Sequence, residues 1–364
     1  MSLPKRRRTN PDEHVTSNPA TAYPTVKHQT VLILPRSGRT ALTSRGRTGS
    51  VGPVTRRLLG LLLAVLLVGS ACGDKKDASQ QTTGPYAVGV RTITFVDDSR
   101  ALDSRSKQPD GPRRRLVTNL WYPAEGAPSD TEVADAKPAK GPFPLIVFSH
   151  GRSGEPQQYA ASFRIWARAG YVVAGVRHPL TVRGLPFGAV TEDIVNEPAD
   201  QTFVITKLGA EESSLVDVDH VAVAGHSSGA IDALATGFNT CCHDKRVDAV
   251  ILESVISPPF KGGTYFKGVP ATPVLFFHGD ADSNFPYAAG HDVFEQTKPP
   301  KFFVTIKGGG HTSPYRDGPP DYHLVAQASL DFFDRYLKDG EDALDRLERD
   351  VAGFPFATLE AVPR

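Results

Sequence analysis

The stretch that decides the fold reads Gly225-His226-Ser227-Ser228-Gly229 and matches the pattern G-x-S-x-G. The apolar run before it, 221–224, is typical of a buried strand, and the run after it, 230–235, is typical of a helix. A serine on a sharp strand-to-helix turn exposes its hydroxyl, and small residues flank it because the turn brings neighbouring backbone close. The alternative is an ordinary turn with a helix-capping serine. In this setting Ser227 is the predicted nucleophile.

Short apolar runs alternate with helical patterns along the rest of the chain. Strands are expected at 88–96, 116–122, 144–149, 171–176, 220–224, 247–255, 273–277 and 302–306, the first two as an antiparallel pair. Helices are expected at 157–169, around 203–208, at 230–235 and at 323–337. This alternation predicts one α/β domain, 85–352, with a mostly parallel sheet covered by helices on both faces. Residues 353–364 are expected to form a C-terminal tail.

A serine nucleophile needs a base and a carboxylate that orients the base. Where the serine stands on such a strand-to-helix turn, called the nucleophile elbow, the chain order is Ser, acid, His. Asp282 follows the strand 273–277, and the carboxyl ends of parallel strands carry the sites of such sheets. It is the expected acid; Asp280 is the nearest alternative and Glu253, at the end of the preceding strand, is another. His311 follows Gly308-Gly309-Gly310 after the strand 302–306 and is the expected base, because glycines allow a close approach of backbones.

The remaining parts expected of the site are two donors for the oxyanion of the tetrahedral intermediate. One is the backbone N–H of Ser228, the residue after the nucleophile. The other comes from the loop 150–154, with the N–H of Arg152 preferred to that of Gly151; the alternative is a plain glycine-rich turn. His226 is expected to point away from Ser227 and to pack beside the turn.

These motifs resemble those of serine esterases with the α/β-hydrolase fold. The matching stretches are FSHGRSG, GHSSG, HGDAD and GGGH, which span Pro144 to His311. They are most similar to the branch that holds platelet-activating-factor acetylhydrolases, dienelactone-hydrolase-like enzymes, chlorophyllases and polyester-degrading cutinases. The resemblance implies that Ser227, Asp282 and His311 are nucleophile, acid and base. Dienelactone hydrolases themselves carry cysteine at the elbow, so the serine favours ordinary ester chemistry.

The substrate is less well defined by the sequence. Only 256–272 separate two consecutive strands, which excludes a large cap there, although 180–200 could form a small flap. An open site suits bulky, lipid-like or polymeric esters. Phe260, Phe285 and Tyr287 are expected in loops near the site, where they either line an acyl or aromatic pocket or pack locally.

The N-terminal region has the pattern of an export signal. Residues 55–71 join a pair of arginines to an apolar run and small residues, as in a signal peptide, and the run is short for a membrane span. Cys72 follows Gly69-Ser70-Ala71, which resembles a bacterial lipobox and implies lipidation of Cys72; the alternatives are secretion in soluble form and an uncleaved anchor. Residues 72–84 are the expected lipidated end and tether. Residues 1–54 are either a disordered extension or the result of a start assigned too early.

Charge and cysteine content limit the partners. Residues 1–71 hold 11 Lys/Arg and 2 Asp/Glu, which leaves 30 basic and 38 acidic residues and a net charge of −8 on the exported part, and argues against nucleic acid. The adjacent Cys241 and Cys242 are expected to be two thiols, because a disulfide between neighbours is sterically awkward. Neither CxxC nor HExxH occurs, so no metal is expected. The expected chemistry requires no cofactor.

The sequence therefore predicts an exported, lipid-anchored carboxylic ester hydrolase with the α/β-hydrolase fold and no large cap. Its substrate is expected to be an ester of a small molecule, a lipid or a polyester. The protein is expected to associate with the membrane through its lipid anchor. Two alternatives stay open at this point: an acyltransferase or serine peptidase with the same triad, and a non-catalytic binding lipoprotein on this fold. Neither the natural ester nor the oligomeric state follows from the sequence.

Overall fold

The computed structural model describes residues 84–103, 111–260, 262–316 and 321–364, which belong to one compact unit, Cys72–Arg364. The predicted signal peptide, Cys72 and the tether up to residue 83 lie outside the described residues. Among the helices of the described ranges, none combines the length and the apolar character that a membrane crossing requires.

The described chain forms ten strands in a single sheet. In chain order the strands are β1 (Ala87–Ala101), β2 (Arg113–Ala124), β3 (Glu132–Ala134), β4 (Phe143–Ser149), β5 (Val172–Arg177), β6 (Val216–His226), β7 (Val247–Glu253), β8 (Val274–Gly279), β9 (Lys301–Ile306) and β10 (Ala357–Val362). The spatial order is β10-β9-β8-β7-β6-β4-β5-β2-β1-β3. The central strands from β5 to β9 pair in parallel, whereas β1, β2 and β10 pair antiparallel to a neighbour. The predicted antiparallel pair at the start of the domain is confirmed.

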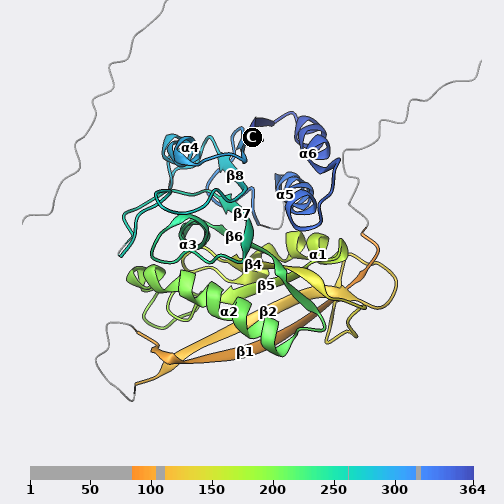
Figure 1. Ribbon diagram of the computed structural model, residues 1–364, viewed down its shortest axis with the longest axis vertical. Coiled ribbons are helices and arrows are strands. Elements are labelled where there is room, and N and C mark those ends of the chain that lie inside the picture. The colour runs from red at the N-terminus through yellow and green to blue at the C-terminus, as the bar shows by residue number, and fades with distance from the viewer. Residues whose placement is uncertain (1–83, 104–110, 261, 317–320) are drawn as a thin grey trace, which may run out of the picture. The chain divides into compact units, whose positions relative to one another are not determined.

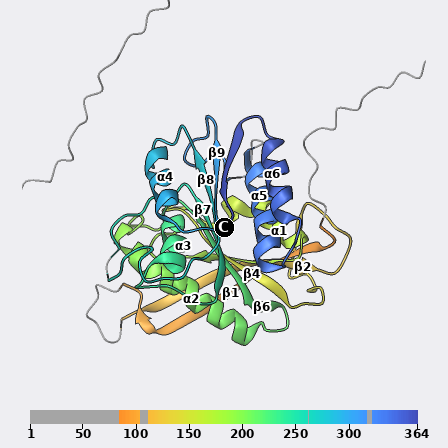
Figure 2. The ribbon, with the colours of Figure 1, turned by 45° about the horizontal axis from the view of Figure 1, so that its top comes forward.

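Helices cover both faces of the sheet, as the alternating pattern predicts. They are α1 (Ala160–Arg168), α2 (Glu197–Glu211), α3 (Ser228–Phe238), α4 (Tyr287–Gln296), α5 (Asp321–Leu337) and α6 (Ala343–Ala352), with short 3-10 helices at Pro156–Tyr159 and Thr191–Asn196. Residues of α2, α3 and α4 belong to one hydrophobic core, and residues of α1, α5 and α6 belong to the other. Figures 1 and 2 show these two groups of helices on opposite sides of the sheet.

The central strands are buried on both faces, which explains their continuous apolar runs. In β4, Leu145 and Val147 pack in the core beneath α2 and α3, while Ile146 and Phe148 pack in the core beneath α1 and α5. All four side chains are fully buried. Because successive side chains of a strand point to opposite faces, each such strand contributes to both cores.

Two segments differ from the expectations at the C-terminal half. Residues 353–364 are not a tail outside the fold, because β10 pairs with β9 from Ala357↔Ile306 to Val362↔Lys301. Tyr287 lies in the first turn of α4 rather than in a loop.

The segment 256–272 contains neither a helix nor a named strand among its described residues, in agreement with the predicted absence of a large cap there.

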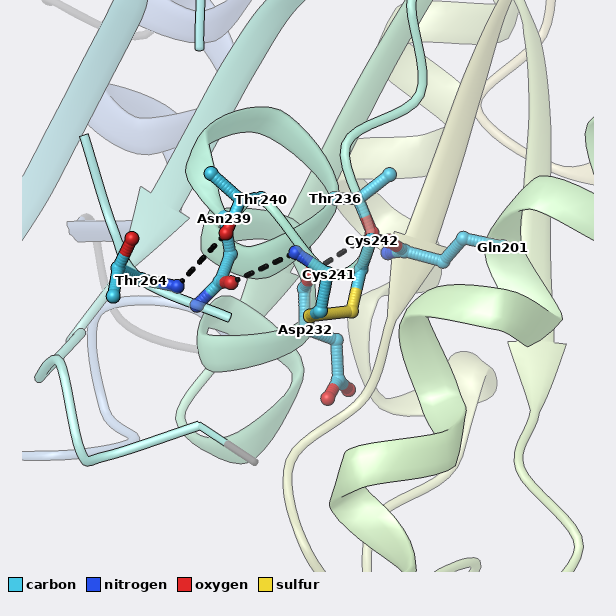
Figure 3. The surroundings of a disulfide bond; sticks show 8 residues. All are labelled: Gln201, Asp232, Thr236, Asn239, Thr240, Cys241, Cys242 and Thr264. Carbon is cyan, nitrogen blue, oxygen red and sulfur yellow. Dashed lines mark hydrogen bonds between the residues drawn. A yellow bond between two sulfur atoms is a disulfide. The ribbon is translucent and has the colours of Figure 1, made fainter. Parts of the chain in front are cut away.

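The expectation that Cys241 and Cys242 are separate thiols is wrong, because the structure joins them in a disulfide. The chain turns sharply after α3, where the N–H groups of Cys242 and His243 both donate to the carbonyl of Asn239. The Asn239 side chain also accepts from the N–H of Cys241 at 3.1 Å, as Figure 3 shows. The disulfide thus lies within a hydrogen-bonded turn.

Candidate active site

Ser227 occupies the turn between β6 and α3, the position that the sequence pattern predicts. Its backbone lies at φ 59° and ψ −119°, in a region that non-glycine residues rarely adopt. A Cβ at Gly225 would lie 2.2 Å from the carbonyl oxygen of Gly229, and one at Gly229 would lie 2.0 Å from that of Ser149. The predicted need for small residues around the serine follows from these contacts with neighbouring backbone.

The structure brings Ser227, His311 and Asp282 into one hydrogen-bonded series. His311 Nδ1 lies 2.8 Å from Asp282 Oδ2, and its Nε2 lies 2.8 Å from Ser227 Oγ. A carboxylate can only accept, so Nδ1 carries the proton and Nε2 is left to accept the serine O–H. This is the tautomer that a general base requires.

The environment of Asp282 keeps its carboxylate ionised. Burial raises its pKa, but hydrogen bonds from His311 and from the N–H groups of Phe285 and Asn284 outweigh burial and lower the pKa below its ordinary value. The two alternative acids are placed differently. Asp280 accepts the N–H of Gly308 at 2.6 Å. Burial raises the pKa of Glu253 well above its ordinary value, and no hydrogen bond joins Glu253 to His311 among the described residues.

The glycines before His311 allow the close contact between loops that the sequence predicts. The carbonyl oxygen of Gly309 lies 2.1 Å from where a Cβ of Gly279 would stand. The N–H of Ala281 donates to the same carbonyl at 3.1 Å. The segment that carries His311 is thus held against the one that carries Asp282, which sets the distance between the two side chains.

The two expected oxyanion donors have free backbone amides within the described chain. No acceptor is found for the N–H of Arg152 or of Ser228 among the described residues. The N–H of Gly151 instead points to Tyr159 Oη at 3.5 Å. A Cβ at Gly151 would lie 3.2 Å from Ser227 Cβ, so the loop 150–154, here called the oxyanion loop, runs directly against the serine.

His226 makes contacts that the sequence did not reveal. Its Nε2 lies 2.6 Å from the carbonyl oxygen of His311, and its Nδ1 lies 2.8 Å from Tyr159 Oη. Among the described residues the His226 ring forms no hydrogen bond with Ser227, in agreement with the expectation, but it is hydrogen-bonded on both nitrogens rather than merely packed beside the turn. Tyr159 reads in sequence as an apolar helix position, and no local pattern indicates that its hydroxyl reaches a residue 67 positions later.

An apolar cluster on α3 reaches His311 through Phe285. Its buried members are Ile231, Ala235 and Phe260, and the partly buried Phe285 packs on it. The Phe285 ring stands edge-on to His311 with a centroid distance of 4.9 Å. Tyr287 lies apart from this cluster: its hydroxyl bonds Thr305 Oγ1 at 2.7 Å, and its ring packs on Phe303 and His278.

A second buried polar network lies behind the oxyanion loop. His178, Glu197 and Asp232 are fully buried, and their possible ligand atoms lie within 4.8 Å of one another, a spacing that a metal ion could bridge. Both nitrogens of His178 are already hydrogen-bonded, to Ser149 Oγ at 2.8 Å and to Asp200 Oδ2 at 3.0 Å. Burial and the neighbouring Glu197 raise the pKa of Asp232 well above its ordinary value. His178 could therefore bind a metal ion only by giving up one of these two hydrogen bonds.

The strand order, the serine on a strand-to-helix turn and the chain order Ser227, Asp282, His311 define an α/β-hydrolase fold. The same fold is found in a solved ferulic acid esterase from Streptomyces cinnamoneus, which matches with a TM-score of 0.59 and 24% identity over 75% of this chain and 96% of that one. Comparisons with models of protein families and with curated proteins find no match.

Proposed function

We propose that the chain is an exported serine hydrolase that cleaves carboxylic esters through an acyl-enzyme on Ser227. The hydrogen-bonded series from Ser227 through His311 to Asp282, with the base tautomer assigned by its partners, carries the proposal. The resemblance of the sequence motifs to those of serine esterases supports it. The fold shared with a ferulic acid esterase supports it as well.

The proposed reaction uses each part of the site once in each half-cycle. Ser227 Oγ attacks the ester carbonyl carbon while its proton moves to His311 Nε2, and Asp282 stabilises the charged imidazole. The backbone N–H groups of Ser228 and Arg152 bind the oxyanion. Collapse breaks the ester C–O bond, and the alcohol leaves with the proton from His311. Water then attacks the acyl-enzyme by the same path and releases the acid.

The apolar cluster beside the elbow supports a substrate that carries an apolar group next to its ester carbonyl. Ile231 lies one turn along α3 from Ser227, and Phe285 touches the ring of the base histidine. We assign Phe285, with Phe260 behind it, to binding of an acyl or aromatic group of a small-molecule, lipid or polymeric ester. Tyr287 is not part of this assignment, because its hydroxyl and ring are engaged elsewhere.

A short-chain nitrophenyl ester tests the ester-hydrolase proposal. The purified protein is expected to release nitrophenol in a steady, enzyme-dependent reaction. A protein that turns over neither this ester nor an aryl ester such as a methyl cinnamate would contradict the proposed function.

The pH dependence of kcat/KM should show the loss of one proton-accepting group on acidification. Protonated His311 cannot accept the serine proton. The lowered pKa of Asp282 keeps its carboxylate ionised, and burial lowers the pKa of His226 to about 3, so neither adds a second step. We expect the acid limb of log kcat/KM to have a slope of about 1. A flat profile down to about pH 4, or a slope near 2, would contradict this assignment.

Export and a lipid anchor on Cys72 are part of the proposal and rest on the sequence pattern of residues 55–72. In a bacterial host that processes lipoproteins, the full chain is expected in the membrane fraction. Cys72→Ser is expected to shift the protein to the soluble exported fraction, because the lipidated thiol is lost. Equal membrane association of both forms would refute the anchor, and soluble wild-type protein would favour release after cleavage.

A further inference from the structure

We propose that Tyr159 and His226 are positioning residues that hold the oxyanion loop and the base histidine in register through one directed chain of hydrogen bonds. The inference rests on the proposed ester hydrolysis at Ser227, because it assigns a role at the same site. Neither side chain is proposed to touch the substrate.

The first link joins His226 to the backbone of the base. His226 Nε2 lies 2.6 Å from the carbonyl oxygen of His311. A carbonyl oxygen can only accept, so Nε2 carries the proton of His226. This bond restrains the main chain at the residue whose ring must reach Ser227 Oγ at 2.8 Å.

The second link follows from the first. With its proton on Nε2, His226 has an unprotonated Nδ1, which accepts the Tyr159 O–H at 2.8 Å. The Tyr159 oxygen then has lone pairs left for the N–H of Gly151, which approaches it at 3.5 Å. The series therefore runs in one direction, from the Gly151 amide through Tyr159 and His226 to the His311 carbonyl.

The surroundings keep both side chains neutral and in place. Tyr159 and His226 are each 1% exposed. Burial lowers the pKa of His226 to about 3 and raises the pKa of Tyr159 to about 12. The Tyr159 ring packs on Phe148 and Phe163, and the His226 ring packs on Tyr315, which restrains the orientation of both rings.

The oxyanion loop and His311, which this series of hydrogen bonds connects, follow different strands of the sheet. The oxyanion loop follows β4, whereas His311 follows β9, and the elbow after β6 lies between them in sequence and in the sheet. Transition-state stabilisation requires the oxyanion donors and the base to be placed together, and a misplacement of about 1 Å costs about 100-fold in rate. A direct connection through the elbow supplies that coordination.

Substitutions at the two residues test the role through kcat. Tyr159→Phe keeps the ring and removes both hydroxyl bonds, and we expect kcat for a nitrophenyl ester to fall about 10-fold with KM within about twofold. His226→Phe removes both ring nitrogens and should lower kcat about 100-fold. His226→Gln keeps an Nε2–H donor for the His311 carbonyl and should recover most of that loss.

Tyr122→Phe is the matched control. Tyr122 is fully buried, and its hydroxyl donates to the carbonyl of Ala136 at 2.8 Å, on the β1–β2 side of the sheet. Its kcat should stay within about twofold of that of the wild type, even if the substitution lowers the thermal unfolding midpoint. The positioning role would be overturned if Tyr159→Phe and His226→Phe both kept the kcat of the wild type. It would also be overturned if, at equal thermal stability, they lost no more kcat than Tyr122→Phe.

The tautomer of His226 supplies a measurement that does not depend on the variants folding. In protein labelled with 15N-histidine, the His226 ring should be neutral from about pH 5 to 9 with its proton on Nε2. A proton on Nδ1, or titration within that range, would overturn the proposed chain even if the wild type hydrolyses esters. Absence of ester turnover by the wild type would instead overturn the proposed function, and the positioning role with it.

Discussion

Ser227→Ala is expected to lower kcat/KM for a nitrophenyl ester by about 10,000-fold or more, because it removes the oxygen that forms the acyl-enzyme in the proposed mechanism. Ser228→Ala is the matched control one residue away. Ser228 contributes its backbone N–H in the proposed mechanism, and its Oγ is buried with no hydrogen-bond partner in the described chain. Its activity should stay within about threefold of wild type.

The paired serine variants separate the proposed nucleophile from its neighbour. Substantial activity in Ser227→Ala, or an equal loss in Ser228→Ala, would contradict the assignment of the elbow serine. Circular dichroism and the thermal unfolding midpoint of both variants show whether the fold is kept. Ser227 adopts a positive φ, and alanine keeps the Cβ that strains this conformation, so the unfolding midpoint should stay close to that of the wild type.

Asp282→Asn is expected to lower kcat by about 10,000-fold, although it changes only one atom. The carboxylate now accepts from His311 Nδ1 at 2.8 Å and so leaves Nε2 free to accept the serine proton. An asparagine whose NH2 group faces Nδ1 would favour the opposite tautomer, in which Nε2 carries the proton and cannot act as the base.

Asp280→Asn is the control for Asp282→Asn. Asp280 lies two residues away, is exposed, and accepts the N–H of Gly308, and asparagine keeps an oxygen that can accept this bond. Its kcat should stay within about threefold of wild type. If Asp280→Asn lost as much activity as Asp282→Asn, the acid would have to be reassigned.

The parts of the fold that could be predicted are those whose burial leaves a local mark. A strand such as β4, buried on both faces, requires a continuous apolar run, and that run is visible in the sequence. The edge strand β10 is half exposed, and it pairs with residues of β9 that lie 51 (Ala357↔Ile306) to 61 (Val362↔Lys301) positions earlier. Its sequence therefore carries no comparable signal.

The same contrast applies to the site. Ser227, Asp282 and His311 stand at strand ends next to glycines or in a recognisable turn, so position and chemistry point to them together. The bonds of Tyr159 and His226 depend on ring orientation and on a partner from another strand. The disulfide between Cys241 and Cys242 depends on the turn after α3. Such features follow from tertiary contacts rather than from spacing along the chain.

A fluorophosphonate probe, followed by digestion and mass spectrometry, tests the central claim most directly. Such a probe forms a covalent adduct with an activated serine oxygen, and the modified peptide reports which serine reacted. We expect one adduct, on Ser227, formed in the wild type and in Ser228→Ala but absent from Ser227→Ala. An adduct on another residue, or an unlabelled wild-type protein, would contradict it.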